Sequence, residues 1–201
     1  MIDVSLSQSF LNPKSVAIIG ASADPKKTSS RAQRFLVSHG YKGKIFPVNP
    51  NREEIFGLKC YPNLKSINEH IDHIFIAVDS NKIIEAIKDA ISKKVRCATI
   101  LSGGFSETGC EGNDLEKHVF KIAKKGDLRI LGPNSIGLIN ISDNVILSAN
   151  AMLELQDLKK GSLGVISHSG SLIGALLAHG HSRGLGFSKL VSVGKESDLS
   201  V

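Results

Sequence analysis

The sequence predicts an α/β fold in which parallel strands alternate with helices. Short β-branched runs recur along the first two thirds of the chain, and stretches with apolar residues at helical spacing separate them. A loop rich in glycine or proline follows several of these runs. Consecutive parallel strands need such crossovers, and ligands of these sheets bind beyond the carboxyl ends of the strands. We therefore expect the loops to gather at one edge of the sheet and to form the functional site.

Five strands are predicted in the first part, each a short aliphatic run that ends at a turn. They lie at residues 16–19, 44–48, 74–78, 98–101 and 128–131. Helices are predicted between them at 28–39, with Gly40 as the stop, and at 113–125. Asp79 or Ser80 is expected to cap a further helix, which carries isoleucines at the spacing of one helical face. These are Ile83, Ile84, Ile87 and Ile91.

The pattern changes near Asn140. Residues 141–151 lack a helical period and are predicted to form an extended connector. A strand at 162–166, a helix at 170–183 and a strand at 187–193 follow. One strand-helix-strand unit cannot bury both faces of its sheet. We therefore predict a first domain at 1–145, and at 146–201 a connector with the incomplete start of a second α/β domain.

Composition and charge exclude several classes of protein. The chain has 201 residues, of which 41% are hydrophobic and 22% charged, as in ordinary globular proteins. Its apolar runs are too short to span a membrane, and it lacks a signal-peptide pattern. Three cysteines without CxxC spacing argue against a zinc site or a disulfide framework, so we expect a cytoplasmic protein with reduced thiols and no bound metal.

The net charge of +6 raises the question of an anionic partner. The lysines and arginines are scattered, mostly near the ends of predicted helices, and no basic stretch is interleaved with aromatic residues. A solvated basic surface explains this pattern better than nucleic-acid binding does. A phosphorylated small ligand would need only one or two of these charges.

The loop at residues 20–25 follows the first strand, where nucleotide-binding α/β proteins bind phosphate. Its small residues let the backbone approach an anion. The dinucleotide fingerprint GxGxxG is absent, because Ser22 and Pro25 occupy the later glycine positions. After the second strand, Asn49 and Arg52 stand where an NAD-binding domain has an acid. A cation there suits a ribose phosphate, as in coenzyme A or NADP. For the loop at residues 20–25, an ordinary tight turn stays an alternative.

Three further loops are candidates for ligand binding. Residues 102–107 and 132–137 follow the fourth and fifth strands, and their glycines permit conformations closed to other residues. Residues 167–171, SHSGS, join the later strand to its helix. Their hydroxyls and amides are suited to hold a phosphate at the helix N-terminus, or the serine simply caps the helix.

Six sequence runs taken together resemble the NDP-forming acyl-CoA synthetases. They are SVAIIGAS, GYKGKIFPVNPNREEIFGLKCYPNL, ILSGGFSETG, LGPNSIGLIN, ISHSGSL and GFSKLVSVG. That family includes the ADP-forming acetate–CoA ligases and is related to the succinyl-CoA synthetase α subunit. The resemblance covers nearly all of residues 12–201, in the same order. It implies a Rossmann-like coenzyme A-binding domain followed by the start of a flavodoxin-like domain.

The resemblance also implies which residues contact coenzyme A. Residues 22–25 would meet its phosphates, Arg52 would replace a basic contact residue, and 78–80 would lie by the nucleotide. Residues 101–103 would follow the pantetheine arm, and 134–135 would lie near the thiol. The implied coenzyme A-binding residues are Gly20, Ser22, Ala23, Asp24, Pro25, Asn49, Arg52, Val78, Asp79, Ser80, Leu101, Ser102, Gly103, Asn134 and Ser135. The implied phosphate loop of the second domain is Ser167, Ser169, Gly170 and Ser171.

The family reaction joins a small carboxylic acid to coenzyme A with ATP, through an acyl phosphate and a phosphohistidine. The resemblance implies that ATP or ADP and magnesium bind in an ATP-grasp domain or subunit outside this chain, and that the assembly is oligomeric. The family's catalytic histidine has no counterpart before Val201, so no catalytic residue is expected here. His168 fills a position that is commonly glutamine or arginine and is interpreted as a loop variant.

The sequence departs from the family pattern at two places and leaves two other functions open. Ser135 stands where many relatives have cysteine, and Lys195-Glu196 replaces an Asn-Glu pair. One alternative function is a coenzyme A-binding or regulatory module without turnover. The other is an NADP-dependent oxidoreductase, which the missing third glycine and the absence of a catalytic Tyr-Lys or His pair disfavour. An ATP-grasp pattern downstream or in a neighbouring partner would favour the ligase.

Overall fold

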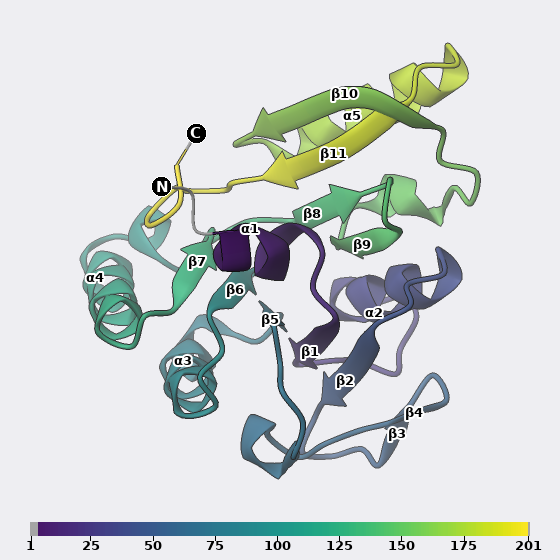
Figure 1. Ribbon diagram of the computed structural model, residues 1–201. Coiled ribbons are helices and arrows are strands. Elements are labelled where there is room, and N and C mark those ends of the chain that lie inside the picture. The colour runs from purple at the N-terminus through teal and green to yellow at the C-terminus, as the bar shows by residue number, and fades with distance from the viewer. Residues whose placement is uncertain (1–3, 201) are drawn as a thin grey trace.

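The computed structural model describes residues 4–200 and contains a parallel sheet with the strand order β2-β1-β5-β6-β7 (Figure 1). All four strand pairs of this sheet are parallel. Its strands are β1 (Ser15–Ile19), β2 (Lys44–Val48), β5 (His73–Ile76), β6 (Cys97–Ile100) and β7 (Arg129–Leu131). The five predicted strands and the predicted α/β class are thus confirmed.

Both faces of the parallel sheet are buried, because successive side chains of a strand point to opposite faces. In β1, Ala17 and Ile19 belong to one apolar cluster, whereas Val16 and Ile18 belong to another. Helices α3 (Ile83–Ser92) and α4 (Cys110–Lys125) contribute to the first cluster. Helices α1 (Val4–Leu11) and α2 (Thr28–Ser38) contribute to the second. The sheet therefore lies between two layers of helices, as Figure 1 shows.

A second sheet has the order β10-β11-β8-β9 and is mixed. Strands β10 (Lys160–Ser167) and β11 (Phe187–Ser192) are parallel and are joined by α5 (Gly170–Ser182). The strands β8 (Gly137–Asn140) and β9 (Val145–Ser148) form an antiparallel hairpin, and β8 pairs with β11. Strands β10 and β11 thus extend a sheet that begins with the β8–β9 hairpin.

The expected extended connector at 141–151 is extended only in part. It contains the turn of the hairpin and strand β9, and its last residue begins a 3₁₀ helix, η4 (Ala151–Glu154). Every residue of β9 is buried, so the strand lacks the alternation of apolar and polar residues that marks a half-exposed strand. The predicted domain boundary after residue 145 falls inside β9, and the division into two domains stays a prediction.

Several smaller elements differ from the expectations. Helix α4 begins at Cys110, three residues before the predicted start. Asp79 precedes a 3₁₀ helix, η2 (Ser80–Lys82), and its side chain makes no capping hydrogen bond, so the expected cap is not formed. The sequence analysis did not anticipate α1 or a short hairpin of β3 (Glu54–Ile55) and β4 (Leu58–Lys59). Two more 3₁₀ helices are η1 (Leu64–Ser66) and η3 (Ser106–Thr108).

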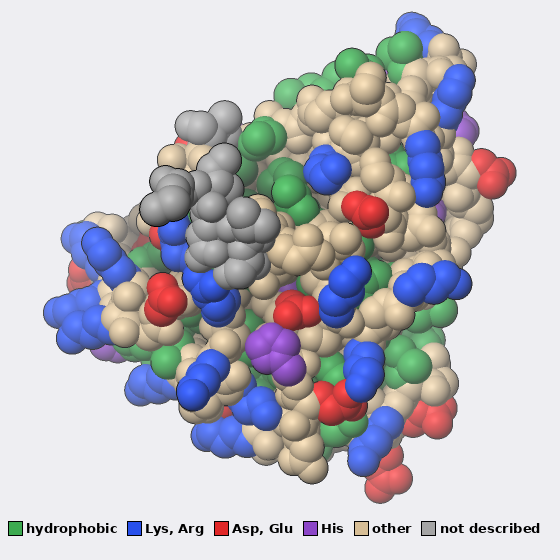
Figure 2. All heavy atoms as spheres, viewed as in Figure 1, with side chains coloured by type: hydrophobic (Ala, Val, Ile, Leu, Met, Phe, Trp, Pro, Cys, Tyr) green, Lys and Arg blue, Asp and Glu red, His purple; other side chains and the backbone are tan. Residues whose placement is uncertain are grey.

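Two features of the whole surface bear on partners. Over residues 4–200, no helix combines the length and the apolar character that crossing a bilayer requires. Figure 2 shows lysine and arginine side chains distributed over the visible face, with acidic side chains among them. The scattered basic residues of the sequence are thus also scattered on this face.

Candidate functional site

The strand order places a topological switch point between β1 and β5. The chain passes from β1 to β2 on one side and then returns to form β5 on the other side. Loops leaving two such strands diverge and open a crevice at their carboxyl ends. Gly20 lies there with φ +83°, and a Cβ at this position would be 2.5 Å from the carbonyl oxygen of Ala77. Only glycine fits this close approach of the two loops.

The loop after β1 is organised by hydrogen bonds within itself. Ser22 Oγ accepts from the backbone N–H of Asp24 at 3.1 Å, and Asp24 Oδ1 accepts from that of Lys26 at 2.9 Å. Lys27 precedes α2 without a capping side-chain bond. Among residues 4–200, no side chain therefore caps the start of α2, and uncapped amides at a helix N-terminus are the arrangement that binds anions.

Asn49 joins the end of β2 to this loop. Its Nδ2 donates to the carbonyl oxygen of Ala21 at 2.8 Å, while its Oδ1 accepts from the backbone N–H of Asn51 at 2.9 Å. Arg52 follows three residues later and is exposed. Within residues 4–200, its guanidinium has no hydrogen bond or ion pair, so its charge is free to bind a ligand.

Two adjoining clefts lie at the carboxyl ends of the strands and share Val78 as a lining residue. The larger has a volume of about 560 Å³ and is lined by Thr28, Ser29, Ala77, Val78, Asp79, Ser80, Leu101, Ser102 and Gly103. The smaller, of about 400 Å³, includes Gly20, Asn49 and Lys82 in its lining. Eight residues predicted from the sequence thus line the two clefts: Gly20, Asn49, Val78, Asp79, Ser80, Leu101, Ser102 and Gly103.

Hydrogen bonds connect the loops that line the larger cleft. Ser102 Oγ donates to the carbonyl oxygen of Val78. The backbone N–H of Leu101 donates to Ile76 O at 3.0 Å, and that of Asn134 donates to Ser102 O at 3.1 Å. The loops after β5, β6 and β7 are therefore fixed relative to one another.

The remaining predicted residues of the first part do not line either cleft. Residues 22–25 and Arg52 lie at the same edge of the sheet but outside the linings. Asn134 is exposed with φ +56°. Ser135 is fully buried, and its Oγ donates to Ser192 O at 2.5 Å and accepts from the N–H of Gly137 at 3.0 Å. This hydroxyl is occupied by bonds within the protein.

The loop at 167–171 lies on the second sheet, apart from the linings of both clefts. Ser169 is the N-cap of α5 and accepts from the N–H of Leu172 at 3.1 Å, while Ser167 Oγ accepts from the N–H of Ser169 at 3.1 Å. Gly170 and Ser171 begin the helix. The N-cap interpretation of this loop is thus confirmed, and phosphate binding stays a prediction.

His168 is exposed, with Nδ1 3.1 Å from the carbonyl oxygen of Gly194 and Nε2 3.5 Å from Glu196 Oε2.

The sequence analysis missed Thr28, Ser29 and Ala77 as lining residues of the larger cleft. Thr28 and Ser29 begin the helix that follows the glycine loop. Their place at this helix start is the sequence feature from which they could have been predicted. Among residues 4–200, no group of three or more histidine, cysteine or acidic side chains could hold a metal ion.

Comparison with protein families identifies the first part of the chain. The family model described as CoA binding domain matches residues 14–141, which is more than half of the chain. The chain belongs to the CoA-binding domain family. A second model, the succinyl-CoA ligase like flavodoxin domain, matches residues 160–201. The resemblance to NDP-forming acyl-CoA synthetases, and coenzyme A as the cofactor of the family, are confirmed.

Two curated relatives of this CoA-binding domain have names that describe ADP-forming ligases. An acetate–CoA ligase [ADP-forming] II of Archaeoglobus fulgidus is 38% identical over 189 residues, which are 93% of this chain and 28% of the relative. The α subunit of acetate–CoA ligase [ADP-forming] II of Pyrococcus furiosus is 37% identical over 94% of this chain and 40% of the relative. The chain therefore spans between a quarter and two fifths of the length of these relatives.

Solved structures agree with these relatives. The apo form of a dinucleotide-forming acetyl-coenzyme A synthetase 1 from Candidatus Korarchaeum cryptofilum superposes with a TM-score of 0.90 at 34% identity. The match covers 98% of this chain and 41% of that chain. The same synthetase has been solved in complex with phosphate and ADP, with a TM-score of 0.89. The CoA-binding domain thus corresponds to one part of a longer enzyme.

Proposed function

We propose that this chain is the coenzyme A-binding portion of an acid–thiol ligase. The whole protein would form an acyl-CoA from a small carboxylic acid, coenzyme A and ATP, with release of ADP and phosphate. The observation that carries the proposal is the pair of clefts at the carboxyl ends of the strands, lined in part by residues from three of the family's motif runs. The similarity to ADP-forming acetate–CoA ligases over 93% of the chain supports the same reaction class.

In this proposal each loop has a separate task in holding the cofactor. The uncapped start of α2 and the loop at 20–25 receive the phosphates, and the free guanidinium of Arg52 binds the ribose phosphate. Val78, Asp79 and Ser80 lie along the nucleotide. Leu101, Ser102 and Gly103 follow the pantetheine arm, which brings the thiol toward Asn134 and Ser135.

The exposed apolar side chains of the second part support a longer protein. Leu163, Ile166, Leu172, Leu176 and Leu185 are each about 40–60% exposed. All five lie on β10, on α5 or in the turn after it, and Figure 2 shows hydrophobic side chains at the rim where these elements lie. Patches of this kind mark surfaces that another segment covers. We propose that the remainder of the flavodoxin-like domain packs there.

The phosphoryl chemistry would then take place outside residues 1–201. ATP or ADP and magnesium would bind to an ATP-grasp domain or partner subunit in an oligomeric assembly. The reaction would proceed through an acyl phosphate and a phosphohistidine. The loop of Ser167, Ser169, Gly170 and Ser171 would present the N-terminus of α5 to that phosphohistidine. The free thiols, of which Cys60 and Cys97 are buried, support a reducing compartment such as the cytoplasm.

Isothermal titration of the purified chain with coenzyme A, dephospho-coenzyme A and NAD tests the proposal. We expect binding of coenzyme A, weaker binding of dephospho-coenzyme A because the ribose phosphate is missing, and no binding of NAD. Absence of coenzyme A binding, or equal affinities for coenzyme A and NAD, would contradict the proposed function.

A further inference from the structure

The segment at 194–198, called the strap here, leaves β11 and returns to the parallel sheet. In Figure 1 it is the yellow chain end that passes beside β7 and the start of α4. The backbone N–H of Lys195 donates to Pro133 O at 3.0 Å. Asp198 accepts from Arg129 Nε at 3.0 Å and from the N–H of Ile130 at 2.7 Å. Both ends of the strap are thus attached to the first part of the chain.

The Lys195 ammonium lies among three polar side chains near the start of α4. Its Nζ is 3.0 Å from Glu107 Oε2 and 3.3 Å from Glu116 Oε2, and it donates to Ser106 Oγ. The Lys195 and Glu116 side chains are only 30% and 17% exposed. One partly buried ammonium group therefore forms ion pairs with two carboxylates.

These two carboxylates hold the backbone of the loop that follows Gly103. Glu107 Oε1 accepts from the N–H of Gly104 at 2.6 Å and of Phe105 at 3.1 Å. Glu116 Oε2 accepts from the N–H of Ser106 at 3.1 Å. Three consecutive amides are thus fixed by acceptors that Lys195 neutralises.

The loop they hold belongs to the wall of the larger cleft. Ser102 and Gly103 line that cleft directly, and Phe105 anchors the loop as a fully buried side chain. At Gly104, which has φ +92°, a Cβ would lie 2.8 Å from Ser80 Oγ, and Ser80 is another lining residue. A shift of residues 103–106 would therefore change the shape of the cleft.

Electrostatics couples the ammonium to the two carboxylates. Burial alone would raise the pKa of Glu107. Hydrogen bonds from the backbone N–H groups of Phe105, Glu107 and Gly104 and from the Lys195 ammonium outweigh this effect and lower that pKa to about 2. Burial would lower the pKa of Lys195, and its bonds to Glu107 and Glu116 outweigh this effect and raise it. Without the ammonium, two ionised carboxylates would face each other and repel.

We propose that Lys195 is a positioning residue for the coenzyme A cleft, an inference that rests on the proposed function. Its ammonium neutralises Glu107 and Glu116, and these hold residues 104–106 in the conformation that forms the cleft wall. Lys195 does not touch the cofactor itself and acts on it only by positioning this loop. The strap thereby makes the shape of the cofactor site depend on residues that follow the second sheet.

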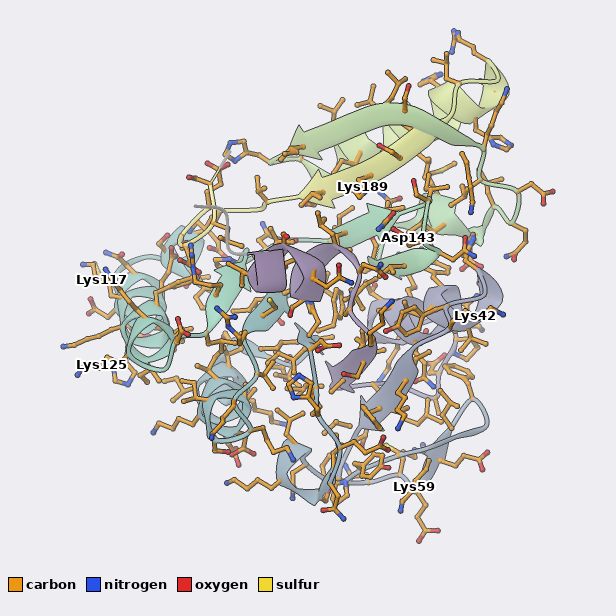
Figure 3. The ribbon with its side chains drawn as sticks, in the orientation of Figure 1. Lys42, Lys59, Lys117, Lys125, Asp143 and Lys189 are labelled. Carbon is orange, nitrogen blue, oxygen red and sulfur yellow. The ribbon has the colours of Figure 1, made fainter. Side chains whose placement is uncertain are left out.

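Three variants of the chain test this inference: Lys195→Met, Lys195→Arg and the control Lys189→Met. Lys189 lies on β11 and, among residues 4–200, makes no side-chain hydrogen bond or ion pair; Figure 3 shows it away from the α4 side chains. By titration calorimetry we expect Lys195→Met to weaken coenzyme A binding about tenfold, the scale of one charge-assisted contact. Lys195→Arg should recover most of the affinity, and Lys189→Met should match the wild type.

Amide hydrogen exchange separates local loosening from a general loss of stability. In Lys195→Met we expect the amides of residues 104–106 to exchange faster, while those of β5 and β6 exchange at the wild-type rate. If wild type binds coenzyme A and Lys195→Met binds equally well, or if protection of 104–106 is unchanged, the inference is overturned and the proposed function stands. If wild type does not bind coenzyme A, both are overturned.

Discussion

At the residue scale, Arg52 is the strongest candidate for distinguishing between related nucleotides. It is exposed after β2, next to Asn49, which lines the smaller cleft. Because its guanidinium has no partner among residues 4–200, Arg52 keeps all its donors for a ligand, and phosphate is the group that its planar geometry suits best. The position also lies where a dinucleotide-binding domain holds a ribose hydroxyl with an acid.

Replacing Arg52 by alanine should weaken coenzyme A more than dephospho-coenzyme A. A hydrogen bond to a charged group contributes about 1–3 kcal/mol, so the loss for coenzyme A is expected in that range. Calorimetric titration of both ligands measures the difference. Lys42→Ala is the matched control, because Lys42 precedes β2 at the opposite, amino-terminal end of the strand (Figure 3). An equal loss for both ligands would show that Arg52 does not bind the ribose phosphate.

Single residues also show where sequence reasoning reached its limit. The glycine at position 20, Asn49 and the run at 101–103 could be found because strand ends and small residues are local features. The bond of Ser135 Oγ to Ser192 O joins residues 57 apart in the chain, so no local pattern predicts that this hydroxyl is occupied. The contacts of Lys195 with Glu107 and Glu116 join residues 88 and 79 apart and were missed for the same reason.

At the scale of elements, the β8–β9 hairpin connects the two sheets to a common core. Leu138 and Leu147 pack in the cluster that includes Val16 and Phe75 of the parallel sheet. Ile139 and Ile146 point to the opposite face and pack with Ile173 of α5. The hairpin is therefore buried on both sides and fixes the position of the second sheet.

The hairpin should be unusually sensitive to substitution at Gly137. This residue has φ +101°, and a Cβ there would lie 2.2 Å from Leu147 O across the strand pair. Gly137→Ala should lower the free energy of unfolding by at least about 2 kcal/mol, from backbone strain and the clash together. Gly40→Ala, with φ +75° and nothing within 4 Å of the added Cβ, isolates the strain and should cost only about 1 kcal/mol. Urea unfolding of both variants measures the two values, and similar losses would contradict the role of the clash.

Elements were predictable where a pattern is local and repeated. The strands of the parallel sheet are short apolar runs bounded by turns, and the isoleucines of α3 recur at helical spacing. Strand β9 and helix α1 were not predicted, because the side chains that each buries pack against residues distant in the sequence. In α1, Phe10 packs edge-on against the His73 ring at 5.1 Å, and Ser9 O lies 3.2 Å from His73 Nδ1. Such contacts come from the tertiary structure and leave no period in the sequence.

At the scale of the whole molecule, the chain combines a nearly closed core with an open edge. The parallel sheet is covered on both faces, whereas β10 is an edge strand whose first five residues are exposed. The linings of the two clefts come entirely from the first part and fall within residues 14–141, which the CoA-binding domain family matches. Acyl and phosphoryl transfer would need the further segments proposed above, because the relatives are between two and four times as long.

The most direct test of the account is to map coenzyme A on the chain by amide hydrogen exchange, with and without the cofactor. We predict slower exchange in the loops at residues 20–29, 49–52, 77–80 and 101–103, where the carboxyl ends of the strands converge. A separate pocket of about 440 Å³ lies at the start of β2, lined in part by Tyr41, Lys44, Lys59 and Tyr61. Protection confined to that pocket, or no protection in the four loops at saturating coenzyme A, would contradict the account.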